Sequence, residues 1–292
     1  DVVALLQSGA GPLPIRDVTA QDLLGREPVP VDVHACRGLS GGRVVLVTGA
    51  AGSIGSELCR QIALLGPERL VMLDNNETGL HDLMAEMASG LKTPDCVGII
   101  GDVCCRAKME RVFAQWRPQI VFHAAAYKHV PLMEEYPEEA TRVNVLGTRN
   151  TIELARCFGA GTFVLISTDK AVHPTSIMGA TKRIGEMLIG ALDGAGTRCT
   201  GVRFGNVLGS RGSVVPTFER QIEAGCPVTI THPDMTRYFM SLSEAVSLVI
   251  QAAVLTRGGD LFVLDMGQPI RIETLARRLI RLRGLRPQVD IP

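Results

Sequence analysis

The feature that most constrains the fold is a glycine-rich turn between an apolar run and an amphipathic segment. The apolar run covers residues 43–48, and Gly49, Gly52 and Gly55 follow it. Residues 57–65 then repeat apolar side chains at helical spacing. A strand, a glycine turn and a helix in this order direct backbone N–H groups and a helix dipole at an anion such as a pyrophosphate. The pattern therefore predicts a dinucleotide site.

Each residue of the turn has its own part in that prediction. Gly49 permits the tight turn, Gly52 lets the backbone approach the phosphates, and Gly55 lets the helix pack closely on the strand. Ser53 and Ile54 lie between the last two glycines, and we expect them to line the same site. An ordinary turn without a ligand is the alternative, and the flanking strand and helix patterns argue against it.

A carboxylate stands where a ribose would need one. Asp74 ends the next apolar run, about twenty residues after the turn, where it can bind a ribose hydroxyl pair. Because a carboxylate repels a 2′-phosphate, Asp74 favours NAD over NADP, and Asn75 and Asn76 add no positive charge. We expect Asn76 beside the cofactor. The alternative is that Asp74 merely ends a strand.

Apolar runs and helical segments alternate through the middle of the chain. The expected strands cover residues 43–48, 69–74, 97–102, 120–126 and 162–168. The expected helices between them cover residues 57–65, 80–87, 108–113 and 137–158. Near-continuous apolar strands separated by helices imply a parallel sheet covered on both faces. Right-handed crossovers then predict an α/β, doubly wound, Rossmann-like fold.

The remaining segments frame this core. Residues 1–42 have no clear period, and we expect an arm or linker that includes a short helix at 17–24. Residues 43–205 form the expected nucleotide-binding domain. Residues 206–292 read as short strands and helices, so we expect mainly a smaller substrate-binding lobe, with some segments returning to the main sheet.

Composition excludes several classes of protein. The 292 residues include 30 basic and 30 acidic side chains, and zero net charge argues against a general nucleic-acid binder. The eight cysteines have no Cys-x-x-Cys spacing, which favours reduced thiols in a cytosolic protein over disulfides or a metal site. No apolar run reaches membrane-spanning length. Asp1 in place of a methionine indicates a fragment of a longer chain.

Acidic and small residues end the third and fourth expected strands. Asp102, followed by Val103, can accept a hydrogen bond from an adenine amino group, and an exposed strand-end carboxylate is an equally good interpretation. Ala124, Ala125 and Ala126 are small enough for a flat cofactor to lie against the backbone. Alanines are also common filler, so these three residues support the cofactor site only weakly.

A hydroxyl, a carboxylate and an ammonium gather at the end of the fifth expected strand, in Thr168, Asp169 and Lys170. Active sites of doubly wound sheets form outside the carboxyl ends of the strands. Pro174 then blocks a helix, and Ser176 can cap a new one.

Two residues of that new helix complete the candidate site. Met178 and Lys182 are four residues apart, hence on one helix face, turned toward the strand end. A lysine beside a nicotinamide can bind the ribose and favour proton loss from a nearby hydroxyl. The alternative is a solvated helix lysine.

These motifs together resemble the extended short-chain dehydrogenase/reductases. That superfamily carries Tyr-x-x-x-Lys on this helix, whereas here Met178 stands in the tyrosine position before Lys182. Thr-Asp-Lys followed by methionine is similar to the large UDP-N-acetylglucosamine (UDP-GlcNAc) 4,6-dehydratases of bacterial polysaccharide and glycan synthesis. The resemblance runs from about Ile15 to Leu282 and is strongest in residues 49–58, 74–77, 124–134, 144–148 and 203–216.

The resemblance implies a reaction in three steps. NAD takes a hydride from C4 of UDP-GlcNAc, water is eliminated across C5 and C6, and the hydride returns to C6. Asp169 is then the acid, Lys170 the base, and Thr168 the partner of the C4 oxygen. For these roles Asp169 must hold a proton and Lys170 must be neutral. Since Met178 accepts no proton, we expect an ordered water, positioned by Thr168 or Lys182, to relay the C4 hydroxyl proton.

The resemblance also implies a nucleotide-sugar site and a cellular setting. The candidate substrate-binding residues are Lys128, Asn206, Ser210, Arg211, Val215 and Arg237. A surface arginine or lysine is the alternative for each cation. Large members carry an N-terminal membrane-spanning region, so we expect the cytoplasmic catalytic domain of an inner-membrane protein. We expect a homo-oligomer that contacts the membrane only through the missing region.

Two other functions remain open. A UDP-sugar 4-epimerase shares the fold, the cofactor and the substrate class, but it has no need of an acid–base pair at C5 and C6. A catalytically silent dinucleotide sensor would tolerate the loss of the tyrosine, but it has no need of residues 168–170.

Overall fold

The structure is a computed structural model that describes residues 29–89, 94–192, 196–286 and 289–290. Within these residues, seven parallel strands form one sheet in the order β11-β6-β5-β4-β1-β2-β3. The strands are β1 (Val44–Thr48), β2 (Arg69–Asp74), β3 (Asp95–Ile100), β4 (Ile120–His123), β5 (Thr162–Ile166), β6 (Arg198–Arg203) and β11 (Asp260–Val263). This order confirms the predicted doubly wound α/β fold.

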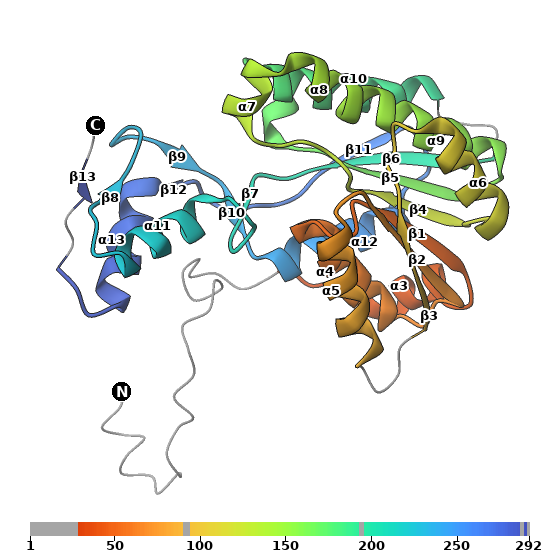
Figure 1. Ribbon diagram of the computed structural model, residues 1–292, viewed down its shortest axis with the longest axis horizontal. Helices are drawn as coiled ribbons and strands as arrows, with labels where there is room; N and C mark the ends of the chain where they lie inside the picture. The colour runs from red at the N-terminus through yellow and green to blue at the C-terminus, as the bar shows by residue number, and fades with distance from the viewer. Residues whose placement is uncertain (1–28, 90–93, 193–195, 287–288, 291–292) are drawn as a thin grey trace, which may run out of the picture.

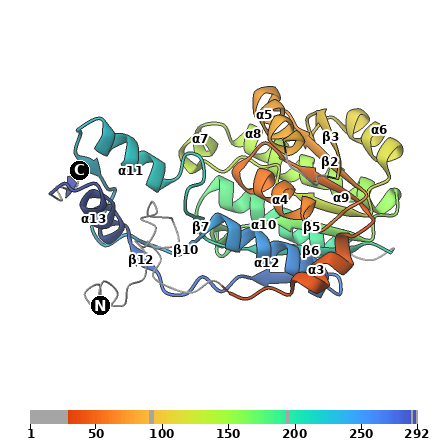
Figure 2. The same cartoon turned by 90° about the horizontal axis from the view of Figure 1, so that it is seen from below.

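Helices cover both faces of the sheet (Figures 1 and 2). One face carries α3 (Val33–Ser40), α4 (Ser53–Ala63), α5 (Glu77–Ala88) and α12 (Leu242–Leu255). The other carries α6 (Arg106–Trp116), α8 (Pro137–Thr141), α9 (Thr148–Cys157) and α10 (Ile177–Leu192), with α7 (Val130–Glu135) at its edge. In the described part of the chain, no helix is both long and apolar enough to cross a bilayer.

The alternation of one central strand divides the core in two. Val45 and Val47 of β1 belong to the cluster beneath α4 and α12, and Leu46 between them belongs to the cluster beneath α6 and α9. All three side chains are fully buried. A strand buried on both faces is the reason for the continuous apolar run in the sequence.

Segments distant in sequence complete the α12 face. Cys36 and Leu39 of α3 are buried in the same cluster as Val246 of α12, so the segment expected to be a linker contributes a helix to the core. α12 and β11 lie in sequence between the two parts of the lobe but return to the main sheet, where β11 pairs with β6. The helix expected at residues 17–24 lies outside the described residues.

Several strand boundaries differ from the predictions. β3, β4 and β5 end two or three residues early, so Asp102, the alanines after His123 and Thr168 all lie in the loops that follow. β6 was missed because arginines flank it and Gly201 interrupts its apolar pattern; β5 and β11 bury it from both sides. The long helix expected at residues 137–158 contains a π-helical turn, η1 (Arg142–Gly147), between α8 and α9.

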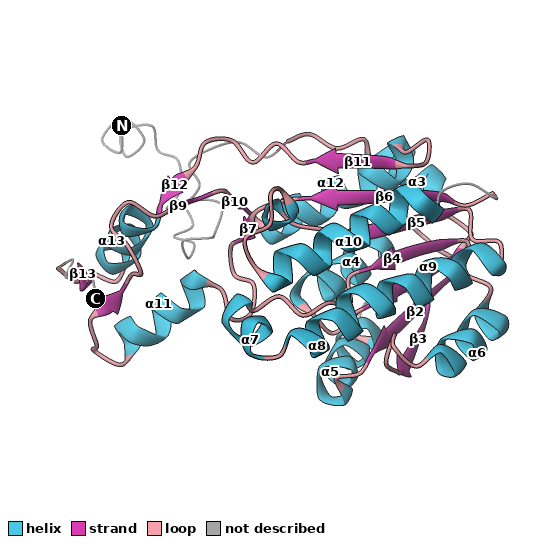
Figure 3. Cartoon of the chain, turned by 90° about the horizontal axis from the view of Figure 1, so that it is seen from above, coloured by secondary structure: helices cyan, strands magenta, loops and turns pink. Residues whose placement is uncertain are grey.

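The lobe beyond the C-terminal edge of the sheet has its own small core (Figure 3). Its elements are α11 (Val214–Glu223), β8 (Val228–Thr229), β9 (Thr236–Arg237), β12 (Ile270–Arg271), α13 (Ile272–Leu282) and β13 (Val289–Asp290). The short strands β7 (Asn206–Val207) and β10 (Phe239–Met240) pair where the chain passes between the two parts. α13 turns one face into this core and leaves its arginines outside, as an amphipathic helix should.

The glycine turn between β1 and α4 has the geometry that the sequence predicts. Gly49 adopts a φ of +69°, and a Cβ there would lie 2.5 Å from the backbone nitrogen of Ala125. A Cβ on Gly55 would lie only 1.9 Å from the carbonyl oxygen of Gly49. The first turn of α4 therefore packs directly against the turn that leaves β1, which only glycine allows.

We expect Gly55→Ala to lower the free energy of unfolding by about 3 kcal/mol, because the backbone must move to admit the methyl group. Gly190→Ala is the matched control, since it lies on an exposed part of α10 and an added methyl group there would meet no atom within 4 Å. The control should be neutral or stabilising by about 1 kcal/mol. Urea unfolding of both variants measures the difference, and equal stabilities would contradict the close-packing role.

Candidate active site

Two adjoining cavities open at the carboxyl ends of the strands. The first, about 360 Å³, lies over the glycine turn and the ends of β2 and β3. The second, about 530 Å³, lies between the glycine turn, the end of β5, α10 and the loop after β7. Both are lined by the glycine turn, by Ala124 and Ala126, and by residues 127–129. Because they share these lining residues, the two cavities form one cleft at this edge of the sheet.

The first cavity collects most of the residues predicted to bind the cofactor. They are Gly49, Gly52, Ser53, Asp74, Asn76, Asp102, Val103, Ala124, Ala125 and Ala126. The carboxylate of Asp74 accepts backbone N–H groups from Ala51 at 2.8 Å and from Asn76 at 2.8 Å. Each of its oxygens retains acceptor capacity for a further donor. Asp74 thus links the glycine turn to the end of β2 while facing the cavity.

Asp102 is held by its own neighbours. Its carboxylate accepts hydrogen bonds from Arg142 at 2.9 Å and from the Cys104 amide at 2.8 Å. Burial raises the pKa of this carboxyl, but the hydrogen bonds from Arg142 and Cys104 outweigh it and lower the pKa overall. Asp102 therefore remains a carboxylate at the wall of the first cavity.

The second cavity collects most of the predicted catalytic and substrate residues. Ile54, Gly55, Lys128, Thr168, Lys170, Met178, Lys182, Asn206 and Ser210 line it. Asp169 is not among its lining residues, but its carboxylate accepts hydrogen bonds from Thr168 Oγ1 at 2.9 Å and Lys170 Nζ at 3.0 Å. Lys170 Nζ also donates to Asn206 Oδ1 at 3.2 Å. The hydroxyl, carboxylate and ammonium predicted to act together are therefore one hydrogen-bonded group.

The carboxylate and the ammonium of this group are in direct contact. Asp169 and Lys170 form an ion pair, with a quarter to a third of each side chain exposed (26% and 34%). Moving one proton along the 3.0 Å contact from Lys170 to Asp169 converts the ion pair into a neutral acid and a neutral amine.

α10 is positioned by two caps at its start. Ser176 Oγ accepts the Gly179 N–H at 3.1 Å, which confirms the predicted cap, and Glu134 accepts the Ile177 N–H at 2.7 Å. A Cβ on Gly179 would lie 2.4 Å from the Lys170 carbonyl oxygen, so the helix packs directly on the Thr-Asp-Lys turn. Met178 and Lys182 consequently face the second cavity, as their spacing predicts.

A buried carboxylate that the sequence analysis missed lies one turn beyond Lys182. Glu186 accepts hydrogen bonds from Ser167 Oγ at 2.6 Å and from Arg203 at 2.6 and 2.7 Å, and Arg183 adds another at 3.1 Å. Burial lowers the pKa of Lys182 to about 8, and the charge of Glu186 opposes that shift. The four-residue spacing from Lys182 was the available signal, since it places both side chains on one helix face.

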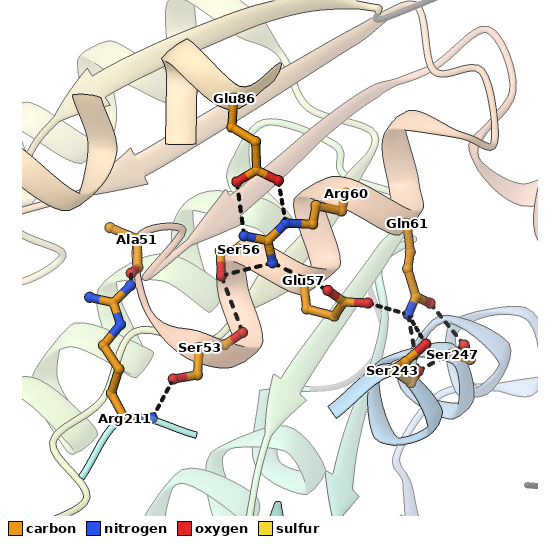
Figure 4. A network of polar contacts seen from close by, with 10 residues as sticks. All are labelled: Ala51, Ser53, Ser56, Glu57, Arg60, Gln61, Glu86, Arg211, Ser243 and Ser247. Atoms are coloured by element: carbon orange, nitrogen blue, oxygen red, sulfur yellow. Dashed lines mark hydrogen bonds and ion pairs between the residues drawn. The ribbon is translucent and has the colours of Figure 1, made fainter. Parts of the chain in front are cut away.

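Arg211 contacts the glycine turn (Figure 4). Its guanidinium donates to the Ala51 carbonyl at 2.6 Å and its backbone N–H donates to Ser53 Oγ at 3.0 Å. Lys128 Nζ donates to the Arg211 carbonyl at 2.8 Å. Burial lowers the pKa of Lys128, and the charge of Arg211 lowers it further by a smaller amount. The loop that carries Arg211 therefore crosses the junction of the two cavities.

The same view shows how α4 is held from both sides. Arg60 binds Glu86 of α5 through two nitrogens at 2.6 and 2.9 Å, and Gln61 donates to the Ser243 carbonyl of α12 at 3.0 Å.

Two predicted substrate residues lie elsewhere. Val215 is packed in the core of the lobe, and its neighbour Val214 lines the second cavity instead. Arg237 belongs to β9, which pairs with β12, and lines neither cavity. Cavity-lining residues that the sequence analysis did not name include Tyr127, His129, Ser167, Phe204 and Ser213.

A buried histidine supports the floor of the site without facing it. The Thr148 hydroxyl donates to the Asn144 carbonyl at 2.7 Å, so it must accept from His123 Nε2 at 3.0 Å. His123 Nδ1 then accepts from Thr48 Oγ1 at 2.7 Å, and the ring is neutral. Burial, and next the nearby charge of Lys182, lower its pKa to about 3.

Comparison with known families decides the assignment. Residues 45–292 match the family described as polysaccharide biosynthesis protein. The chain belongs to this family. A probable polysaccharide biosynthesis protein, EpsC of Bacillus subtilis strain 168, is 52% identical over 272 residues, which are 92% of this chain and 46% of EpsC. The chain thus spans just under half the length of that relative. The uncharacterized membrane protein MJ1061 of Methanocaldococcus jannaschii is 46% identical over 242 residues, 82% of this chain and 71% of the relative.

Solved structures share the fold of this family member. Pen from Bacillus thuringiensis aligns with a TM-score of 0.80 and 32% identity over 86% of this chain and 77% of its own. The UDP-glucose 4-epimerase of Thermus thermophilus, solved in complex with NAD, aligns with a TM-score of 0.72 and 25% identity over 85% and 86% of the two chains.

We expect His123 to make the stability of this chain fall in mild acid. The unfolded chain binds a proton at His123 below about pH 6.5, whereas the folded chain does not until about pH 3. The contribution of neutral His123 to the free energy of unfolding is therefore complete above about pH 6.5. It falls as the pH is lowered from there toward pH 3, by about 2 kcal/mol between pH 8 and pH 5. Urea unfolding should show that wild type loses about this much more than His123→Gln. Equal losses would contradict a neutral His123.

Proposed function

We propose that this chain is the catalytic part of an NAD-dependent nucleotide-sugar 4,6-dehydratase, a hydro-lyase that acts on UDP-GlcNAc. The observation that carries the proposal is the hydrogen-bonded group of Thr168, Asp169 and Lys170, of which Thr168 and Lys170 line the second cavity. It brings a proton donor and a proton acceptor to adjacent positions, which elimination of water from neighbouring carbons requires. Lys182 and Met178 line the same cavity from α10.

The first cavity and the adjoining part of the second fit NAD. Gly52 begins α4 without any side-chain cap, so the first N–H groups of the helix remain available for a diphosphate. Asp74, at the far end of the cavity wall, suits a ribose hydroxyl pair. The residues that would hold the cofactor are Gly49, Gly52, Ser53, Ile54, Gly55, Asp74, Asn76, Asp102, Val103, Ala124, Ala125, Ala126 and Lys182. When bound, NAD supplies a reversible hydride acceptor.

The side chains of the second cavity then perform the proton transfers. Thr168 binds the C4 oxygen of the sugar. Neutral Lys170 removes the C5 proton, and Asp169 gives its proton to the departing C6 hydroxyl. After this step Lys170 is an ammonium and Asp169 a carboxylate, which is the ion pair that the structure contains. Their mutual attraction stabilises the state that elimination produces.

The second cavity would also hold the nucleotide sugar. Asn206 and Ser210 line it and are proposed substrate contacts, together with Lys128. Arg211 lies against the glycine turn, so we propose that it serves the diphosphate region shared by the two cavities. Val215 and Arg237 line neither cavity in this structure.

A UDP-sugar 4-epimerase is the second candidate, because a structural relative has that activity and binds NAD. The acid–base pair of Asp169 and Lys170 favours the dehydratase, since epimerisation transfers no proton at C5 or C6. A silent dinucleotide sensor is the third, and it has no use for that pair.

We further propose that the intact protein is a membrane-anchored homo-oligomer with this domain in the cytoplasm. The chain covers only 46% of EpsC, and the relative MJ1061 is described as a membrane protein.

Incubation with UDP-GlcNAc and mass spectrometry test the activity directly. We expect wild type to form a product lighter by one water, and Asp169→Asn to form it at least about 100-fold more slowly because the acid is lost. Asp82→Asn, with a side chain 75% exposed on α5, is the control and should match wild type. An isomer of unchanged mass would indicate the epimerase, and no product from saturating NAD and UDP-GlcNAc would indicate the sensor.

Cofactor choice gives a separate test of Asp74. We expect wild type to bind NAD in preference to NADP, and Asp74→Asn to lose about tenfold or more of that preference because the charge that repels the 2′-phosphate is gone. Calorimetric titration of nucleotide-free protein with both dinucleotides measures the ratio. Equal affinity of wild type for NAD and NADP would contradict this role.

A further inference from the structure

Lys182 places a buried amine at the wall of the second cavity. It is 7% exposed and lines the cavity beside Met178. No hydrogen bond joins its Nζ to any other residue in the described part of the chain. A buried amine without a partner has its acceptor and donor capacity available to a ligand in the cavity.

The residue one turn before it accepts no proton. Met178 is 4% exposed and packs with Met133 and Ala140, and its thioether is only a weak hydrogen-bond acceptor. We infer that Lys182 itself, rather than the ordered water expected from the sequence, accepts as the neutral amine the proton of the C4 hydroxyl when the sugar is oxidised. Glu186 is the positioning residue, because it binds Ser167 and Arg203 and so holds α10 against the ends of β5 and β6. The inference rests on the proposed function and deepens it.

The proton count of this step balances. Oxidation at C4 breaks the C–H and O–H bonds, so a hydride leaves to the cofactor and a proton forms a new N–H bond on Lys182. Later one proton leaves Asp169 with the C6 hydroxyl as water. Lys170 gives the C5 proton back to C5 when the hydride returns to C6, which restores its neutral amine. Return of the proton from Lys182 to Asp169 through solvent restores these two groups, so the cycle consumes no net proton.

The charges around Lys182 suit this role. On α10 itself Glu186 is negative, and Arg203 of β6 and Arg183 bind that carboxylate. His123 of β4 is neutral. The turn packed on α10 carries Asp169 and Lys170, whose opposite charges compensate each other. Burial lowers the pKa of Lys182 to about 8 while Glu186 opposes the shift. Near pH 8 both the amine and the ammonium are therefore populated, as a reversible proton acceptor requires.

Direct titration of Lys182 tests the inference without turnover. In protein labelled with [ε-¹³C]lysine, the resonance missing from Lys182→Arg belongs to Lys182. We expect its midpoint near pH 8 in wild type and about one pH unit lower in Glu186→Gln, because a neighbouring negative charge is lost. A wild-type midpoint near about 10.4, the value of a solvated lysine, would overturn the inference even if the dehydratase activity is present.

Product formation supplies the second arm. The rate for wild type should rise with pH through the Lys182 midpoint, and Glu186→Gln should move that rise to lower pH by the same shift. Lys182→Arg keeps the positive charge but cannot release a proton, so we expect a loss of at least about 100-fold at every pH. Adding Met178→Tyr to Lys182→Arg supplies a phenol acceptor and should recover at least about tenfold.

The arms separate the possible failures. Lys182→Arg that retains product formation within about threefold of wild type overturns the role of Lys182 and leaves the dehydratase proposal standing. If Glu186→Gln is insoluble because Arg203 is left unpaired in the core, the Lys182→Arg comparison still decides. Wild type that forms no dehydrated product refutes the proposed function, whereas the midpoint of Lys182 remains measurable.

Discussion

The close approach of α4 to the end of β1 is the contact on which the cleft depends. A Cβ added to Gly55 would lie only 1.9 Å from the Gly49 carbonyl oxygen, so the start of the helix leaves no room for a side chain. Three long-range contacts then hold the turn in place: Asp74 accepts from the Ala51 amide, and Arg211 binds the Ala51 carbonyl and Ser53. The turn can therefore present uncapped N–H groups to a ligand without being flexible itself.

The second half of the cleft is organised by a buried charge. Glu186 joins α10 to Ser167 at the end of β5 and to Arg203 at the end of β6. These three elements lead directly to Lys182, to the Thr-Asp-Lys turn and to Asn206. A buried carboxylate costs much free energy unless it is fully hydrogen-bonded, and four hydrogen bonds provide that here. The same residue places a negative charge near the buried Lys182 and opposes the effect of burial on the pKa of that lysine.

The two halves of the cleft bear on how the proposed reaction can proceed with Met178 in place of a tyrosine. Met178 is packed with Met133 and Ala140 and closes the cavity wall without taking part in proton transfer. In the proposed mechanism Lys182 accepts the C4 hydroxyl proton, and the ion pair of Asp169 and Lys170 serves the elimination step. Each proposed group lies at the carboxyl edge of the sheet, where parallel strands bring distant loops together.

The sequence by itself determined the fold class, the glycine turn, the Thr-Asp-Lys turn and the helix face of Met178 and Lys182, because these follow from local periodicity and spacing within a few residues. It could not determine β6, because two arginines obscure the apolar pattern of that strand and only its pairing with β5 and β11 buries it. It also could not determine that the side chain of Val215 packs into the core of the lobe. Only the tertiary structure decided the partners of Glu186 and Arg211. The guanidinium of Arg211 meets a carbonyl 160 residues away, and no local pattern encodes which distant backbone a loop will cross.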